Sequence, residues 1–333
     1  MPDSRRKFRY LLWGCLVLCI IISVLSLCLG VVHFSLKELI EALFQKGDKI
    51  NINILKYARI PRTAACLMAG AALSVSGAVL QNVLANKLAS PSVIGVNAGA
   101  GLGVTFCCSL GILSGWAVSL SAFLGSLITV LLISVFSAKT GASKTTVILG
   151  GVALNSMLGA FSESITVLNP DTAALTTDFR VGGFSAVSAE RLLPASILII
   201  AALIILFTLF NELDVLSLGD DSAQSIGLSA KKYRILFLIL SALLAGSAVS
   251  FAGLLGFIGL IVPHFIRKII GNESRYLLPL STIIGAGFVT LCDLIARLIF
   301  MPYELPVGIF MAIIGGPAFV WLLLRMKGGH KNG

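Results

Sequence analysis

The chain alternates between long apolar runs and short polar connections. Eight of these runs are long enough to cross a bilayer, because a spanning helix needs about 20 mostly apolar residues. They cover residues 11–33, 63–85, 116–137, 144–168, 192–210, 234–252, 277–299 and 306–325. Two further segments, 92–110 and 253–270, are apolar but glycine-rich or interrupted. Together the runs predict an all-α polytopic membrane protein of about ten transmembrane helices, with both termini on the same side.

The composition is typical of a protein whose main solvent is lipid. Of the 333 residues, 57% are hydrophobic and 12% are charged, whereas soluble domains have about 25% charged residues. The first apolar run is longer than the roughly 7–15-residue core of a signal peptide, so we expect a retained first helix. We interpret residues 1–333 as one transmembrane domain with polar tails at 1–10 and 326–333.

The net charge of +10 does not indicate nucleic-acid binding, because the basic residues are scattered through the connections without forming a basic face. The distribution of positive charge instead indicates how the chain is oriented in the membrane, because Lys and Arg are more frequent in cytoplasmic connections. With the N-terminus in the cytoplasm, sixteen of the 25 Lys and Arg lie inside, which predicts cytoplasmic N- and C-termini. Six of the remaining nine crowd into residues 37–62, which include Arg59 and Arg62.

The sequence contains no pattern typical of catalysis. Its three histidines are far apart, its seven cysteines form no CxxC pair, and no GxxxxGK[ST] phosphate loop is present. We therefore expect a transport subunit rather than an enzyme, with no cofactor or metal bound by this chain.

The ionisable residues inside the predicted spans are few, and the notable ones are Glu163, Asp293 and Arg297. Such residues are functional candidates, because a charge is costly in lipid. Asp293 and Arg297 are four residues apart on one helix face, so mutual pairing is the simpler interpretation. Glu163 has no partner in its own helix and faces either a wet pathway or another helix. An ion-coupled secondary transporter that uses Glu163 and Asp293 is therefore the alternative function.

The polar segment LSLGDDSAQSIGLSAKKYR, residues 216–234, separates two clear spans on the cytoplasmic side. Asp220 and Asp221 precede a short helix-forming run, Ser222 to Ile226, and Gly227 ends it, as capping preferences favour. A short helix here suits docking to a cytosolic partner, and an ordered loop without a partner fits this stretch equally well.

Two stretches of similar sequence, AGAALSVSG at 69–77 and AGSAVSFAG at 245–253, fall in spans of opposite direction. An inverted-topology repeat, as in many transporters, would produce this pattern. Chance similarity in a chain rich in Ala, Gly and Ser is the other interpretation.

Several motifs occur in a characteristic order from about residue 57 to 325. They are RIPR at 59–62, GAALSVSGAVLQ at 70–81, ASPSVIGVNAGAGLG at 89–103, LGDDSAQSIG at 218–227, GFIGLIVPHFIRKIIG at 256–271, DLIAR at 293–297 and ELPVGIFMAIIGGPAFVWLL at 304–323. In this order they resemble the membrane permease subunit of ABC importers for ferric siderophores, haem and cobalamin.

The resemblance implies a type II ABC importer permease fold in a bacterial or archaeal cytoplasmic membrane. It implies a dimer with a second permease copy or a paralogue, two cytosolic ATP-binding subunits that hold ATP and Mg, and an extracytoplasmic solute-binding protein. The cargo would be an iron chelate, with a ferric siderophore first and haem or cobalamin next. The chelate would cross by alternating access between the two permeases, along the fifth and tenth helices.

The resemblance also assigns roles to individual residues. Arg59, Arg62 and Arg297 match outer arginines that meet carboxylates of the binding protein. Residues 216–230 match the coupling loop that engages the ATPases, through Leu218, Gly219, Asp220, Asp221, Ser222, Ala223, Gln224, Ser225, Ile226 and Gly227. Lys87, the FRVGGF stretch at 179–184 and Ile226 depart from the usual family pattern, so we assign no gate residues.

Overall fold

The computed structural model describes residues 2–46, 48–140 and 144–328, and the regular elements within these ranges are all helices. The elements are α1 (Pro2–Cys28), α2 (Leu36–Leu43), α3 (Lys49–Ile54), the π-helical turn η1 (Leu55–Arg59), α4 (Ile60–Val83), α5 (Val96–Ser109), α6 (Gly115–Thr140), α7 (Lys144–Leu168), α8 (Pro170–Val181), α9 (Ala189–Thr208), α10 (Phe210–Ser217), α11 (Asp220–Ser225), α12 (Ala230–Ala252), α13 (Ile258–Ile270), α14 (Ser274–Ile299) and α15 (Val307–Gly328). The predicted all-α class is confirmed.

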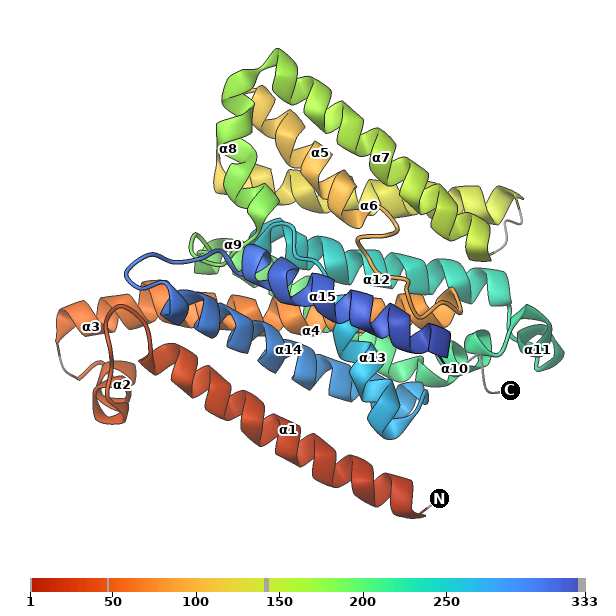
Figure 1. Ribbon diagram of the computed structural model, residues 1–333, viewed down its shortest axis with the longest axis horizontal. Coiled ribbons are helices and arrows are strands. Elements are labelled where there is room, and N and C mark those ends of the chain that lie inside the picture. Colours follow the sequence, from red (N-terminus) through yellow and green to blue (C-terminus); the bar gives the residue numbers. More distant parts are fainter. Residues whose placement is uncertain (1, 47, 141–143, 329–333) are drawn as a thin grey trace.

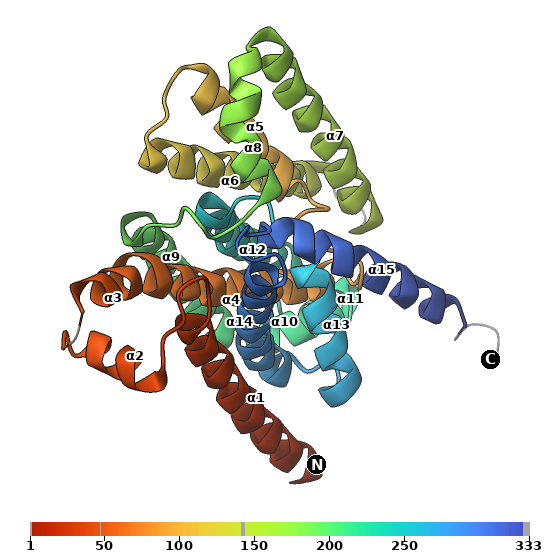
Figure 2. The same cartoon turned by 60° about the vertical axis from the view of Figure 1, so that its left-hand side comes forward.

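The long helices form two groups joined by α12 (Figures 1 and 2). One group contains α5, α6, α7 and α8, with α5 packed on the other three. The other contains α1, α4, α13 and α14, with α4 against α13 and α14 and α1 against α14. Helix α12 packs on both α4 and α6 and so lies between the groups.

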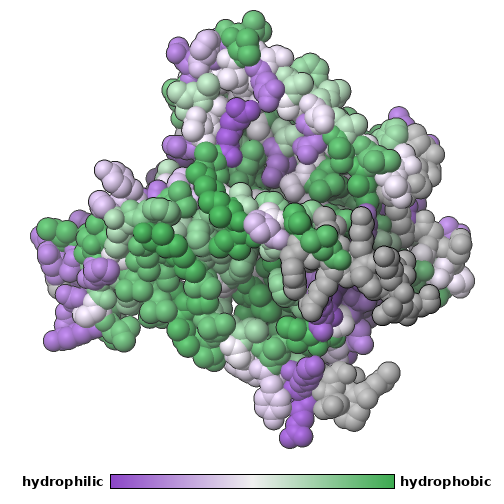
Figure 3. Space-filling model, viewed as in Figure 1, coloured by the Kyte–Doolittle hydropathy of each residue, from purple (hydrophilic) through white to green (hydrophobic). Residues whose placement is uncertain are grey.

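Seven helices of the described chain are long and apolar enough to cross a membrane by length and composition. They lie within Arg6–Cys28, Lys49–Val83, Gly115–Phe136, Thr145–Leu168, Ala189–Thr208, Ala230–Ala252 and Ser274–Ile299. The two interrupted segments form α5 and α13, with 14 and 13 residues. Figure 3 shows hydrophobic side chains over much of the middle of one face, with hydrophilic ones toward α2 and α3 and at the start of α1.

The two ends of the bundle carry different chemistry. We call the end with Arg59, Arg62 and Arg297 the arginine end, and the end with α10 and α11 the short-helix end. Helix α1 begins and α15 ends near the short-helix end (Figure 1), and the placement of both termini on one side of a membrane stays a prediction. His330 and most of the predicted tail at 326–333 lie outside the described residues.

Helix α4 is the centre of the fold. Every residue from Ala69 to Leu84 is buried, which is typical of a helix surrounded by other helices. Glycines allow this close packing: an added Cβ at Gly70 would lie 2.1 Å from the Gly285 oxygen of α14, and one at Gly77 would lie 2.0 Å from the Gly259 oxygen of α13. The backbones of α4, α13 and α14 are therefore in direct contact.

The RIPR motif lies where the π-helical turn η1 passes into α4. The N–H of Ile60 donates to the oxygen of Leu55, five residues back. Pro61 follows and has no N–H to contribute, so it sits at the first turn of α4, where proline is tolerated. The motif thus continues α3 into α4 without a break and sets Arg59 and Arg62 on the side of that helix.

The FRVGGF stretch forms a junction between three helix ends at the arginine end. The N–H of Gly183 donates to the oxygen of Ala252 at 2.9 Å, and the N–H of Gly308 donates to the oxygen of Gly182 at 3.1 Å. Gly182 has a φ of 76°, a left-handed value that favours glycine. The end of α8 is thereby fixed to the end of α12 and the start of α15.

Candidate functional site

The first candidate site is a group of charged side chains at the arginine end, centred on Asp293 of α14. Its side chain is 1% exposed. Arg62 of α4 donates through Nε and Nη2 to the two carboxylate oxygens of Asp293, at distances from 2.9 to 3.2 Å. Nε of Arg297, one turn along α14, lies 3.1 Å from Asp293 Oδ2. The expected pair between Asp293 and Arg297 is present, and Asp293 is shared with a second arginine.

Arg62 also reaches a second carboxylate. Its Nη1 donates to Oε2 of Glu304 at 2.6 Å, in the connection between α14 and α15. The Glu304 side chain is 38% exposed, whereas that of Arg62 is 14% exposed. Arg62 therefore joins a buried carboxylate to one that solvent reaches.

Arg59 is also buried, and it holds the turn that follows α1. Its guanidinium donates to the backbone oxygens of Leu27 and Val32 and lies 4.5 Å from the centroid of the Phe34 ring. A charged donor on backbone oxygens forms strong hydrogen bonds. Arg59 therefore fixes the path of the chain where α1 has ended.

Arg297 ties α1 to the same group. Its Nη2 donates to the oxygen of Ser26 at 3.2 Å and to the Ser26 Oγ at 2.9 Å. Ser26 Oγ lies 3.0 Å from Oγ1 of Thr63 in α4. The arginine end thus connects α1, α4 and α14 through polar contacts, with Arg62 and Arg297 on the two carboxylates and Arg59 on backbone oxygens.

The three predicted docking arginines come together, and each is engaged inside the protein. Arg59 is 6% and Arg297 is 5% exposed. Contact with a binding protein by these residues stays a prediction. Glu304 was missed as a member of the group, although it opens the ELPVGIF motif; its distance of 242 residues from Arg62 in sequence hides the pair.

Glu163 and Asp293, the two carboxylates of the ion-coupled alternative, lie in different helix groups. Glu163 is exposed on α7, which packs on α5, α8 and α6. Asp293 is buried on α14, which packs on α4, α1 and α13. The structure does not bring the two carboxylates together, and Asp293 is paired with Arg62 and Arg297.

The second candidate site is the predicted coupling loop at the short-helix end. A helix is present, α11, and it spans Asp220–Ser225 rather than 222–226, with Gly219 as its N-cap. Gly227 has a φ of 84° and ends the turn, as expected. Ala223 is fully buried, whereas Leu218 and Ile226 are 69% and 68% exposed. Docking of this loop to another protein stays a prediction.

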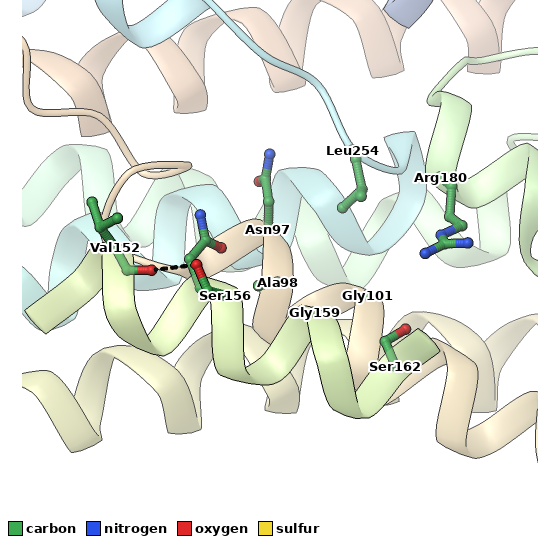
Figure 4. A pocket seen from close by; sticks show the side chains of 10 residues that line it. Asn97, Ala98, Gly101, Val152, Ser156, Gly159, Ser162, Arg180 and Leu254 are labelled. Atoms are coloured by element: carbon green, nitrogen blue, oxygen red, sulfur yellow. Dashed lines mark hydrogen bonds between the residues drawn. The ribbon is translucent and has the colours of Figure 1, made fainter. Parts of the chain in front are cut away.

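A third feature is a cavity of about 390 Å³ between α5, α7 and α8 (Figure 4). Its polar lining includes Asn97 of α5, Ser156 and Ser162 of α7, and Arg180 of α8. Amides, hydroxyls and a guanidinium can hydrogen-bond a polar or anionic group. Among the described residues, no three His, Cys, Asp or Glu side chains group in a way that would hold a metal ion.

We expect Asp293→Asn to destabilise the fold strongly, because Arg62 and Arg297 then lose a buried counter-charge. Breaking a buried pair in this way costs about 3–5 kcal/mol. The matched control is Glu41→Gln, which breaks the exposed Lys37–Glu41 pair of α2 and should cost about 0.5 kcal/mol or less. Denaturant unfolding of the purified protein measures both changes. Equal effects of the two substitutions would contradict the role assigned to Asp293.

The chain matches a known transport family over nearly its full length. The family model described as the FecCD transport family matches residues 18–325. The Fe(3+)-citrate import system permease protein YfmE of Bacillus subtilis is 33% identical over 329 residues, 97% of this chain and 98% of that protein. The hemin transport system permease protein HmuU of Yersinia pestis is 33% identical over 332 residues, 98% of each chain.

The fold comparison agrees with the sequence comparison. A solved structure described as an inward-facing, metal-chelate type ABC transporter superposes with a TM-score of 0.85 at 29% identity, covering 95% of this chain and 99% of that one. The order of motifs, the buried α4 and the separate short-helix end all lie within the matched region. The chain belongs to the FecCD transport family of ABC importer permeases.

Proposed function

We propose that this chain is one of two permease subunits in an ATP-driven importer of an iron chelate, with a ferric siderophore as the preferred cargo and haem or cobalamin next. The observation that carries the proposal is the family match, which spans residues 18–325. The relatives named for iron-citrate and hemin transport support an iron-containing cargo.

The proposed topology places ten helices across the cytoplasmic membrane of a bacterium or archaeon: α1, α4, α5, α6, α7, α9, α12, α13, α14 and α15. The arginine end faces outward and the short-helix end faces the cytoplasm, which leaves both termini inside. This is a type II importer permease arrangement. The similar stretches at 69–77 and 245–253 lie in α4 and α12, which run in opposite directions, as an inverted repeat requires.

Energy conversion is assigned to partner subunits. Two cytosolic ATP-binding subunits hold ATP and Mg and engage α11 of each permease, so this chain itself is not an enzyme. A second permease copy or paralogue packs beside it, and the chelate crosses between them along α7 and α15. Support for this division comes from the exposed Leu218 and Ile226 beside α11, which offer apolar contact area at the short-helix end.

At the arginine end, the proposed partner is an extracytoplasmic solute-binding protein. Its carboxylates would contact Arg62 beside Glu304, where the group is most exposed. The group contains three arginines and two carboxylates, and this excess of positive charge attracts an acidic partner. Docking then requires an incoming carboxylate to replace Glu304 on Arg62, while Asp293 keeps its place.

Uptake into proteoliposomes tests the function directly. We expect the chain, assembled with its ATPase subunits and binding protein, to accumulate a radiolabelled ferric hydroxamate only when ATP is enclosed on the side of the ATPases. Haem and cobalamin serve as alternative cargoes in parallel reactions. Uptake driven by a proton or sodium gradient without ATP would favour the ion-coupled alternative, and Glu163→Gln would then abolish it.

Docking at the arginine end can be measured separately. We expect Arg62→Gln to weaken binding of the solute-binding protein at least about tenfold at low salt, and to flatten the salt dependence, because screening acts on the lost charge. The control is Lys37→Gln, an exposed lysine at the same end. Melting temperatures of both variants show whether the fold is kept, and unchanged affinity in a folded Arg62→Gln protein rules the contact out.

Engagement of the ATPase subunits is tested at Ile226. A charge in place of this 68% exposed side chain removes apolar contact of about 1.5–3 kcal/mol, so Ile226→Asp should lower co-purification of the ATPases and ATP-driven uptake at least tenfold. Ile50→Asp is the matched control, since Ile50 is 64% exposed in α3 at the opposite end. If both variants keep their ATPases, α11 is not the coupling helix.

A further inference from the structure

Helix α11 is attached to the rest of the protein through α10, which precedes it. Leu213 and Leu216 of α10 are fully buried and belong to the main hydrophobic core. Helix α10 packs against α4, α14, α12 and α11, whereas α11 packs mainly on α10 and α12. Figures 1 and 2 both place α10 between α11 and the long helices. A force applied to α11 therefore reaches α4 and α14 through α10, and it also reaches α4 through α12.

One side chain of α10 also contacts the first turn of α14. Both carboxylate oxygens of Asp214 accept the backbone N–H of Ser274, at 2.9 and 3.1 Å. The first N–H groups of a helix lack partners within the helix and carry partial positive charge, so a carboxylate there is stabilising. The N-cap residue Glu273 makes no capping hydrogen bond with its side chain. Helix α14 thus receives its cap from another helix, 60 residues earlier in the chain.

The contact continues from Ser274 into α4. Ser274 is fully buried, and its Oγ accepts a hydrogen bond from Nδ2 of Asn82 at 3.0 Å. Oδ1 of Asn82 in turn accepts from Nη2 of Arg267 in α13, at 2.8 Å. Four side chains, those of Asp214, Ser274, Asn82 and Arg267, and the backbone N–H of Ser274 thereby join α10, α14, α4 and α13 by hydrogen bonds.

Arg267 completes the connection between α13 and α4. Its Nη1 donates to Oε1 of Gln81, and its Nη2 lies 3.3 Å from the oxygen of Ala78. Nε2 of Gln81 donates back to the oxygen of Gly259 at 2.8 Å. Because buried polar groups without partners are costly, these bonds resist separation of the two helices. Helices α4 and α13 are therefore held together at this end.

We propose that Asp214, Ser274 and Asn82 form a link, called here the Asp214 link, that transmits displacement of the coupling helix α11 into α4, α13 and α14. The inference rests on the proposed function, which places the ATPases on α11. Asp214 is a positioning residue: it touches neither cargo nor nucleotide and acts by fixing α10 to the start of α14. Leu213 and Leu216 keep α10 in place without it, so its loss affects transmission more than folding.

The first test measures coupling in the complete transporter in proteoliposomes, with a ferric hydroxamate as cargo. Asp214→Ala should raise the ATP hydrolysed per chelate imported by about tenfold, the size expected for loss of one hydrogen bond to a charged group. Assembly with the ATPases and ATP hydrolysis itself should stay normal. Asp214→Asn, which keeps an acceptor oxygen, should restore part of the coupling. The matched control is Glu273→Ala, which removes an exposed carboxylate beside Ser274.

The second test needs no transport and uses the purified chain. Hydrogen exchange of the backbone amides from Ser274 to Leu277 should be about tenfold faster in Asp214→Ala than in the wild type, with Asp214→Asn between them and Glu273→Ala unchanged. Equal exchange in Asp214→Ala and the wild type would overturn the link itself. Faster exchange with normal coupling would show that the contact only caps α14 and would overturn its role in transmission.

The two tests separate this inference from the proposed function. A wild-type complex that imports no chelate at the expense of ATP would overturn the proposed function and, with it, the transmission role. A wild-type complex that couples normally, together with an Asp214→Ala complex that does the same, would overturn the link alone.

Discussion

The burial of α4 is the constraint on which the rest of the structure depends. From Ala69 to Leu84 the chain is buried, so a polar group there is costly unless it has a partner within the protein. Ser76 donates to the oxygen of Ser241 in α12 at 2.8 Å, and Gly70 and Gly77 admit α14 and α13 to backbone contact. A central helix of this kind turns its neighbours into one packed body, because none of them can shift without opening a void or exposing a polar group.

At each end of this body, an arginine is held by a polar side chain of a neighbouring helix. At the arginine end, Arg62 of α4 is neutralised by Asp293 of α14. At the short-helix end, Arg267 of α13 donates a hydrogen bond to Oδ1 of Asn82 in α4. Nδ2 of Asn82 in turn donates to Ser274, the first residue of α14. The surfaces proposed for the binding protein and for the ATPases thus lie at opposite ends of one helix. The 24 residues of α4 span about 36 Å. The proposed binding protein and ATPases therefore act near opposite ends of α4, which packs against most of the other long helices.

The sequence predicts the helices better than the contacts between them. Long apolar runs are stable in lipid as helices, and seven of the eight predicted runs agree with the structure within four residues at each end. The first run, predicted at 11–33, forms α1 at Pro2–Cys28. Segments 92–110 and 253–270 form shorter helices than full spans, because α5 and α13 begin only after residues with left-handed φ values, Gly95 at 90° and Phe257 at 66°. The pair of Asp293 with Arg297 follows from a spacing of four residues. Arg62 and Glu304 are separated by 242 positions in the sequence, and Asp214 and Ser274 by 60. No local sequence pattern predicts contacts between residues so far apart.

Two of the six positive charges at residues 37–62, those of Arg59 and Arg62, are engaged within the protein. Arg62 lies between two carboxylates and Arg59 lies against backbone oxygens and an aromatic ring, so neither acts as a free charge in the loop. Their first role is to hold α1, α4 and α14 together. Any contact with an acidic partner must then compete with Glu304 for Arg62, since Asp293 is too deeply buried to be displaced. Such an exchange of one carboxylate for another conserves charge balance, which makes docking selective for a partner that presents a carboxylate at the position of Glu304.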